Sequence, residues 1–290
     1  MKRRAAAWIF AAMAVAVAGG AVARSAGMLV PARAKQAAEG PMVPEPKIGP
    51  AAGTLLVAGG GSMRQIWPLF LELAGGPSAP IVVIPTANEA VEGEDRVVQM
   101  LREIGATDVV QLHTRDRAEA NREEFVAPLR RARAVWLEGG RQWRLVDAYL
   151  NTLTHRELTA ILARGGVVGG TSAGASIQAS YLVRGSRQNN RIMMARGYED
   201  GFGFLRDTAI DQHVDTRRRQ DDLRPVLSRH GRLLGIALDE ATALIVRGDL
   251  AEIVGAGRAQ FLTKPDEPPA VLKAGARFDL AARRPATVPE

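Results

Sequence analysis

Short apolar runs alternate with helical patterns along residues 54 to 169, and few folds accommodate that order. Runs typical of buried strands cover Thr54–Ala58, Ile81–Ile84, Asp108–Leu112, Ala134–Leu137 and Val167–Gly169, and helical patterns cover Arg64–Leu73, Glu94–Ile104, Arg122–Arg131, Arg141–Leu150 and His155–Ala163. Parallel neighbours need a crossover between them, and crossover helices cover both faces of the sheet. The pattern therefore predicts an α/β domain of three layers with a mostly parallel central sheet.

The pattern changes after residue 180, where the apolar runs become shorter and more closely spaced. They cover Thr208–Ile210, Leu234–Leu238, Ala243–Val246, Glu252–Val254, Gln260–Leu262 and Val271–Leu272. Closely spaced strands favour antiparallel pairing. We therefore expect the C-terminal part to extend the sheet with antiparallel strands.

The first 23 residues have the pattern of a secretory signal peptide. Lys2, Arg3 and Arg4 form a basic head, residues 5–23 carry no charge, and Ala21-Val22-Ala23 fits a cleavage site with small residues. We expect an exported protein, periplasmic or extracellular. The uncharged run is just long enough to span a bilayer, so a membrane tether through residues 5–23 stays open as an alternative.

Residues 24–50 contain five prolines without apolar periodicity, which predicts a mobile linker. Residues 51–290 are then long enough for a single large domain. The chain has no cysteine, which excludes a disulfide framework and a thiol nucleophile.

The net charge of +7 is concentrated before the domain. Residues 1–23 contribute +3 and residues 24–50 contribute +2, which leaves +2 for residues 51–290. A nearly neutral domain does not favour a nucleic-acid partner.

A serine between two glycines follows the fifth predicted strand, in Gly170-Thr171-Ser172-Ala173-Gly174. A serine on such a tight strand-to-helix turn exposes its hydroxyl, which is the geometry of a nucleophile elbow. An amphipathic helical pattern follows at once, and the N-terminus of that helix would favour negative charge near Ser172. We predict Ser172 as the nucleophile.

A serine nucleophile needs a base, and histidine is the usual one. Of the four histidines, His213 is favoured because it follows an apolar run and has polar neighbours. The acid that orients it would be Asp239 or Glu240, which follow the run Leu234–Leu238. The oxyanion would bind the N–H of Ala173 and one from Gly139-Gly140, a loop that allows close backbone approach.

A glycine run, Gly59-Gly60-Gly61, follows the first predicted strand. A dinucleotide loop that began at Gly59 would need a glycine where Arg64 stands, and the chain has no P-loop. The sequence therefore predicts no nucleotide cofactor, and we expect no metal ion either.

Several motifs together resemble the cyanophycinase and dipeptidase E family of serine peptidases, whose fold is similar to that of class I glutamine amidotransferases. They are LLVAGGGS, IVVIPTAN, the Gly-Gly-x-Gln loop at Gly139–Gln142, GGTSAGA, GFGFL followed by AIDQH, and LGIALDEATALIV, in the order that the family has them. The resemblance implies Ser172 as nucleophile, His213 as general base and Glu240 as orienting acid. In the mechanism that we expect, the N–H groups of Ala173 and Gly140 bind the oxyanion.

The resemblance to cyanophycinases also implies residues that hold the substrate: Gln142, Asp211, Gln212, Arg217 and Arg219. Cyanophycin is a polyaspartate with arginine on each β-carboxyl, so arginines would suit its carboxylates and Asp211 its guanidinium groups. Two positions depart from the cyanophycinase pattern. Asp222, beside Asp221, stands where those enzymes have a further arginine, and Arg141 stands where an acidic or amide residue is usual.

These features imply an exported serine peptidase that hydrolyses cyanophycin or related β-aspartyl-arginine peptides through an acyl-enzyme. A dipeptidase E-like enzyme for other aspartyl peptides, an amidotransferase-like amide hydrolase and an inactive peptide-binding protein are the alternatives. The partner expected is a peptide substrate, and a homodimer stays open.

Overall fold

Nine strands form the larger of two β-sheets in the computed structural model, which describes residues 45–287. Both sheets belong to the unit Pro44–Glu290. The larger sheet has the order β14-β13-β10-β9-β1-β5-β4-β2-β3. Its strands are β1 (Thr54–Ala58), β2 (Ile81–Ile84), β3 (Val109–Gln111), β4 (Ala134–Leu137), β5 (Val167–Thr171), β9 (Thr242–Arg247), β10 (Leu250–Gly255), β13 (Arg277–Asp279) and β14 (Arg284–Ala286).

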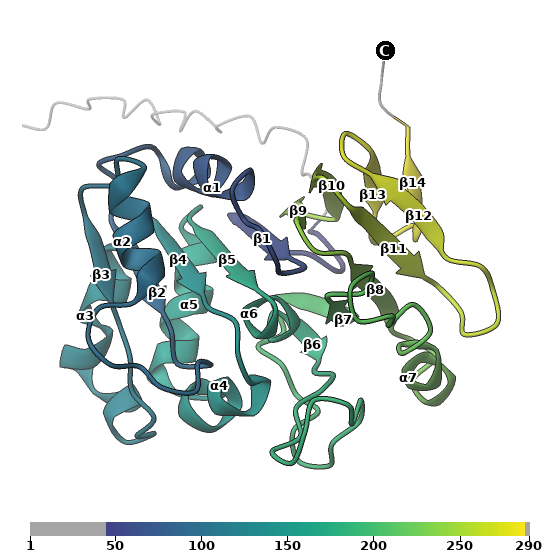
Figure 1. Cartoon of the computed structure of the whole chain (residues 1–290), viewed down its shortest axis with the longest axis horizontal. Coiled ribbons are helices and arrows are strands. Elements are labelled where there is room, and N and C mark those ends of the chain that lie inside the picture. Colours follow the sequence, from purple (N-terminus) through teal and green to yellow (C-terminus); the bar gives the residue numbers. More distant parts are fainter. Residues whose placement is uncertain (1–44, 288–290) are drawn as a thin grey trace, which may run out of the picture. The chain divides into compact units, whose positions relative to one another are not determined.

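The first five strands are parallel and have helices on both faces, as the alternating pattern predicts (Figure 1). The helices of this part are α1 (Ile66–Ala74), α2 (Arg96–Glu103), α3 (Glu123–Arg131), α4 (Gln142–Tyr149) and α5 (Leu153–Ala163), with a 3₁₀ turn at Glu119–Asn121. Alternate residues of each strand point to opposite faces. In β4, Trp136 packs with α1 and α2, whereas Val135 and Leu137 belong to the core under α3, α4 and α5.

The C-terminal strands divide between two sheets, which differs from our prediction that all of them extend the first. Strands β9, β10, β13 and β14 do extend it through antiparallel pairs that begin at β1. A second sheet has the order β12-β11-β8-β7-β6, and β6, β7 and β8 are parallel. Its strands are β6 (Ala179–Tyr181), β7 (Leu205–Gln212), β8 (Leu234–Leu238), β11 (Arg258–Leu262) and β12 (Ala270–Lys273), and α7 (Arg224–Arg229) lies between β7 and β8 in the chain.

The helix after Ser172 is only one turn long, so our prediction of an amphipathic helix there was wrong. Helix α6 covers Ala173–Ser176, and the chain enters β6 at Ala179. The N–H of Phe202 donates to the carbonyl of Ile177 at 2.6 Å, and the N–H of Leu205 donates to that of Gln178 at 2.9 Å. The carbonyls of Ile177 and Gln178 therefore accept hydrogen bonds from the start of β7 and the residues just before it, and they are not available to extend α6.

The last residues of the predicted linker pack against the domain. The carboxylate of Asp249, between β9 and β10, accepts hydrogen bonds from the N–H groups of Lys47, Ile48 and Gly49 at 2.7–3.1 Å. The side chain of Arg206 donates to carbonyls of the same segment, and Ile48 is buried in the core. The folded unit thus begins before residue 51, and residues 1–44 lie outside the described residues.

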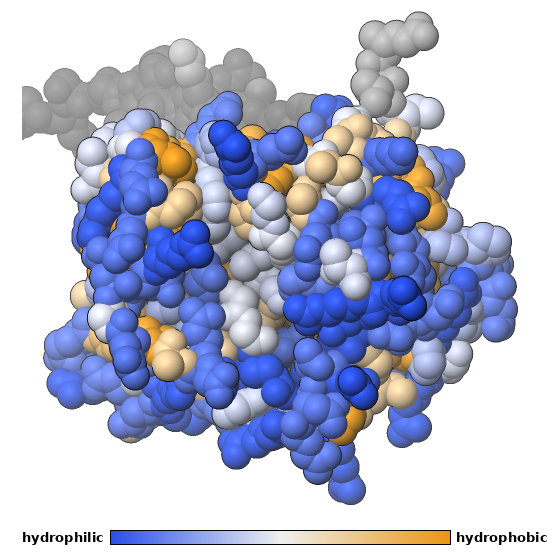
Figure 2. Space-filling view, viewed as in Figure 1, coloured by the Kyte–Doolittle hydropathy of each residue, from blue (hydrophilic) through white to orange (hydrophobic). Residues whose placement is uncertain are grey.

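Figure 2 shows a face that is hydrophilic over most of its area, with only small apolar patches. Within residues 45–287, no helix is both long enough and apolar enough to cross a bilayer. The predicted leader and tether, residues 1–23, fall outside this part of the chain.

We predict that Asp249→Asn lowers the free energy of unfolding by about 2–3 kcal/mol at pH 7, because three N–H groups lose a charged acceptor. Burial raises the pKa of Asp249, but the three N–H donors and Arg206 outweigh it, so the pKa lies below its ordinary value. The stabilisation is therefore present above that ordinary value and is lost as the pH falls through the folded-state pKa.

Urea denaturation at pH 7 and pH 3 checks this prediction. Asp266→Asn is the control, because Asp266 is exposed and forms no hydrogen bond within residues 45–287. Equal stabilities of the two variants at pH 7 would contradict the proposed role of Asp249.

Candidate active site

Ser172 lies at the carboxyl end of β5, in the turn between that strand and α6. Its backbone has φ 53° and ψ −110°, a conformation that side chains rarely adopt. The flanking glycines are required, because a Cβ at Gly170 would lie 2.3 Å from the carbonyl oxygen of Gly174, and one at Gly174 would lie 2.0 Å from that of Leu137. The strained turn holds the serine where the sequence predicts a nucleophile elbow.

The imidazole of His213 contacts both of its predicted partners. Its Nε2 lies 2.9 Å from Oγ of Ser172, and its Nδ1 lies 2.5 Å from Oε1 of Glu240. Ser172 belongs to the first sheet, His213 follows β7 of the second, and Glu240 lies between β8 and β9. The three side chains converge at the junction of two sheets, whereas we expected them at one.

The structure also distinguishes between the two acids that the sequence left open. Asp239 is turned away from His213 and accepts hydrogen bonds from the backbone and guanidinium of Arg258, both at 3.1 Å. Glu240 accepts a further hydrogen bond from Oγ1 of Thr216 at 3.0 Å. Glu240 is therefore fixed against the imidazole, and Thr216 is a supporting residue that the sequence analysis missed.

The other three histidines have structural contacts and no contact with Ser172. His113 bonds Oγ1 of Thr86 at 2.8 Å, and His155 bonds the carbonyl of Phe202 at 2.9 Å. His230 lies against the ring of Tyr181, with centroids 4.5 Å apart.

The environment keeps the imidazole neutral near pH 7. Burial lowers the pKa of His213 below its ordinary value, and Arg217 and Arg219 lower it further, while the hydrogen bond with Glu240 opposes them. The pKa of Glu240 is itself lowered, mainly by its hydrogen bond with His213. A neutral imidazole held by an ionised carboxylate can accept a proton from the serine hydroxyl.

The glycine run after β1 packs directly against this group. A Cβ on Gly60, whose φ is +104°, would lie 2.3 Å from Cε1 of His213, and a Cβ on Gly61 would lie 2.6 Å from Oε2 of Glu240. The N–H of His213 donates to the carbonyl of Gly59 at 2.9 Å. The run Gly59-Gly60-Gly61 does not match a dinucleotide-binding loop. Its lack of side chains leaves the space that His213 and Glu240 occupy.

The two predicted oxyanion donors lie on opposite sides of Ser172 in sequence, and neither N–H forms a hydrogen bond within residues 45–287. Ala173 provides the first N–H of α6. Gly140 has φ +134°, and a Cβ there would lie 2.0 Å from the carbonyl oxygen of Ala87. Its neighbour Gly139 approaches Ser172 closely, since a Cβ on it would lie 3.3 Å from Cβ of Ser172. The N–H of Gly139 is used by Glu138, which leaves Gly140 as the free donor of this loop.

A cavity of about 500 Å³ opens beside Ser172 and His213. Its wall is formed mostly by α1, α2 and the loops after β1 and β4: Gly60, Gly61, Met63, Trp67, Arg96, Val97, Met100, Glu138, Gly139 and Thr171. Burial, and then the nearby Asp95, raise the pKa of Glu138 to about 7. Sequence analysis gave Glu138 no role, although it is the first residue after the predicted strand Ala134–Leu137.

Asp211 is not available to a substrate, which corrects its predicted binding role. It has no exposed surface, and both of its oxygens accept hydrogen bonds from Arg184 at 2.7 Å. The Arg184 guanidinium also contacts Asp222 at 2.5 Å. Asp211 therefore neutralises a buried arginine that the sequence analysis did not single out.

Among the other predicted binding residues, only Arg217 is exposed. Arg219 is buried and donates to both the backbone carbonyl and the side-chain oxygen of Gln212 at 3.0–3.1 Å. Gln142 begins α4 and is also buried, and Arg141 beside it donates to the carbonyl of Ser186 at 2.6 Å. Of this set, Arg217 is the side chain free to meet a ligand without rearrangement.

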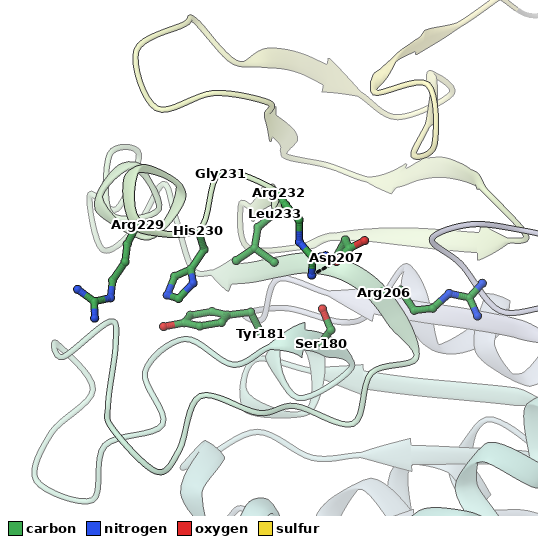
Figure 3. A pocket seen from close by; sticks show the side chains of 9 residues that line it. All are labelled: Ser180, Tyr181, Arg206, Asp207, Arg229, His230, Gly231, Arg232 and Leu233. Carbon is green, nitrogen blue, oxygen red and sulfur yellow. Dashed lines mark hydrogen bonds and ion pairs between the residues drawn. The ribbon is translucent and has the colours of Figure 1, made fainter.

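A larger cavity, of about 670 Å³, lies at the opposite end of the second sheet (Figure 3). Ser180 and His230 both line this cavity, but they do not form a catalytic pair. Ser180 is bonded to the backbone of Thr208, and Figure 3 shows His230 facing Tyr181. The serine and histidine of the smaller cavity are the pair with catalytic geometry.

In the described part of the chain, no group of three or more His, Asp or Glu side chains could hold a metal ion. The chemistry assembled around Ser172 is that of a nucleophile with a base and an orienting acid.

The sequence of the catalytic domain decides the family, because residues 54–254 match the model of peptidase family S51. The chain belongs to this family. It is thus a serine-type peptidase, a hydrolase. A cyanophycinase of Geminocystis herdmanii (strain PCC 6308) is 31% identical over 214 residues, which cover 70% of this chain and 78% of that protein. A cyanophycinase of Synechococcus elongatus is 32% identical over 209 residues, covering 70% of this chain and 64% of that protein, less than two thirds of its length.

Two solved structures share the fold. A peptidase from an acI-B1 actinobacterium superposes with a TM-score of 0.60 at 23% identity, covering 79% of this chain and 97% of that one. A putative peptidase E protein from Listeria monocytogenes EGD-e has a TM-score of 0.53 at 18% identity, covering 71% and 99%. These neighbours confirm the α/β architecture predicted from the sequence.

We predict that Gly60→Ala lowers kcat/KM by at least about 100-fold, because the new methyl group would displace the imidazole of His213. Gly76→Ala is the matched control: Gly76 also has a positive φ, of +93°, but a Cβ there has no neighbour within 4 Å. Peptidase assays and thermal unfolding of both variants separate the clash from backbone strain. Equal activity losses in the two variants would contradict the role of Gly60.

We also predict that Arg217→Gln moves the acidic limb of the pH profile of kcat/KM to higher pH at low salt. Arg217 lowers the pKa of His213, so its removal raises that pKa, and the base then stays protonated to a higher pH. The difference should shrink in 0.5 M salt, because Arg217 is exposed and screened. Arg218→Gln is the control, and an equal displacement in that variant would refute the specific effect.

Proposed function

We propose that the protein is an exported peptidase of cyanophycinase type, which hydrolyses cyanophycin or related β-aspartyl-arginine peptides through an acyl-enzyme. The observation that carries the proposal is the continuous chain of contacts from Ser172 through His213 to Glu240, at 2.9 and 2.5 Å. That arrangement supports proton transfer from the hydroxyl to a base whose orientation is fixed.

In the proposed mechanism, Oγ of Ser172 attacks the carbonyl carbon of the scissile peptide bond, and the hydroxyl proton passes to Nε2 of His213. The carbonyl oxygen becomes an oxyanion that accepts hydrogen bonds from the N–H groups of Ala173 and Gly140. The C–N bond then breaks as His213 returns the proton to the departing amine. Water, deprotonated by His213, attacks the ester, and the acid product leaves with Ser172 restored.

The substrate class is supported by the relatives and by charges near the site. Both relatives described above are cyanophycinases. Asp222, which departs from the cyanophycinase pattern, contacts Arg184, and its neighbour Asp221 contacts Arg224 at 2.7 Å, so both carboxylates are paired within the protein. An acidic peptide backbone would therefore meet Arg217 rather than free carboxylates. The export part of the proposal is supported by the leader pattern of residues 1–23 alone.

We predict that Ser172→Ala lowers kcat by about 10⁴–10⁶-fold and leaves the free energy of unfolding within about 1 kcal/mol of the wild type. The assay uses residues 44–290 with cyanophycin, β-aspartyl-arginine peptides, aspartyl dipeptides and glutamine, and a fluorophosphonate probe labels the active serine. Ser62→Ala is the control, because Ser62 is an exposed serine in the neighbouring glycine loop.

Wild-type turnover in Ser172→Ala would remove Ser172 from the mechanism. Cleavage of aspartyl dipeptides or glutamine in place of the arginine-containing substrates would overturn the substrate class. Absence of both turnover and labelling in the wild type would favour an inactive binding protein.

A further inference from the structure

The carboxylate of Glu138 is the one acidic side chain in the wall of the cavity beside Ser172, and it has no cationic partner within residues 45–287. Its two oxygens accept hydrogen bonds from Nε1–H of Trp136 at 2.8 Å and from the N–H of Gly139 at 3.3 Å. Both donors are neutral. They fix the position of the carboxylate without balancing its charge.

This arrangement is unfavourable for an isolated protein. A largely buried carboxylate costs free energy unless a cation compensates it. The carboxylate of Asp95 repels that of Glu138 and makes its ionised form still less favourable. Arg96 lies in the wall of the same cavity but is exposed and forms no ion pair with Glu138. The structure therefore places an acidic side chain beside the nucleophile, and no cation within residues 45–287 compensates its ionised form.

The rest of the cavity wall indicates which ligand would provide the missing charge. Met63, Val97 and Met100 give it an apolar surface, and Trp67 adds an indole ring. Apolar and aromatic walls around a carboxylate suit a cation carried on an aliphatic stem, because the stem packs while the cation meets the acid and the ring. Small anions or neutral polar groups would leave both features unused.

We propose that this cavity is the subsite for a long cationic side chain of the bound peptide, with Glu138 as the counter-ion and Trp67 against the stem. The inference rests on the proposed function, because it concerns the peptide attacked by Ser172. For β-aspartyl-arginine substrates, the side chain is that of arginine, and its guanidinium forms charge-assisted hydrogen bonds with Glu138. Glu138 is then a specificity-determining residue rather than a part of the proton relay.

The test compares an arginine-containing β-aspartyl peptide with the same peptide carrying citrulline, whose neutral urea group has nearly the shape of guanidinium. The enzymes are the wild type, Glu138→Gln and Glu103→Gln. Glu103 is the control, because it is an exposed carboxylate of α2 outside the cavity. We expect the wild type and Glu103→Gln to prefer arginine by about 10–100-fold in kcat/KM, mainly through KM.

The preference for arginine should fall to within about threefold in Glu138→Gln. If Glu138 only supports Trp136 and Gly139, the substitution would change both substrates alike and leave the ratio at its wild-type value, which would overturn the proposal. A wild-type enzyme that does not distinguish arginine from citrulline would also overturn it.

Calorimetric binding to catalytically inactive protein tests the subsite independently of turnover. Ser172→Ala should bind the arginine peptide about 10–100-fold more tightly than the citrulline peptide, and Ser172→Ala/Glu138→Gln should not. Tight, charge-dependent binding without wild-type hydrolysis would refute the proposed function but support the subsite. Hydrolysis without charge dependence would refute the subsite alone.

Discussion

The imidazole of His213 lies between the carboxylate of Glu240 and the hydroxyl of Ser172, which belong to different parts of the fold. The glycine run after β1 leaves room for this arrangement. Ser172 comes from the parallel sheet, whereas His213 and Glu240 follow strands β7 and β8 of the second sheet. The relative position of the two sheets therefore sets the distance between nucleophile and base. A displacement of about 1 Å between Ser172 and His213 would slow catalysis strongly. Side chains on Gly60 and Gly61, in the loop after β1, would cause such a displacement because their Cβ atoms would clash with His213 and Glu240.

Buried charge forms a second layer behind the catalytic group. The Arg184 guanidinium is almost completely buried between Asp211 and Asp222, and Arg219 is bonded to Gln212, the residue before His213. Removing one member would leave an uncompensated charge in the interior. These residues act through the position of β7 and the turn after it, whereas Glu138 lies in the cavity itself. Arg184, Asp211 and Asp222 thus neutralise one another within the protein, whereas we propose that the carboxylate of Glu138 is neutralised by a ligand.

The sequence predicts the parallel part of the fold well because each strand is a continuous apolar run. The strands Thr54–Ala58, Ile81–Ile84 and Ala134–Leu137 have the predicted bounds. The division of the C-terminal strands could not be predicted, since local patterns do not specify which strands pair. The same limit applies to Asp211, whose role depends on Arg184, 27 residues earlier in the chain.

The site shows a similar division between local and long-range information. The turn at Ser172 and the strand before His213 have local signals, and the choice of Glu240 over Asp239 came from the family resemblance before the contacts supported it. Glu138 has no motif, and its importance depends on burial and on the absence of an ion pair. Unpaired charge is a property of the folded surroundings, so sequence pattern alone does not reveal it.

The anchoring of residues 47–49 by Asp249 has a consequence for access to the enzyme. Strand β9 is antiparallel to β1, so Asp249 lies near the amino end of β1, while Ser172 lies beyond the carboxyl end of the neighbouring β5. The polypeptide thus enters the domain on the side away from the mouth of the catalytic cavity. A bulky polymer could therefore approach the serine without meeting the anchored residues 47–49.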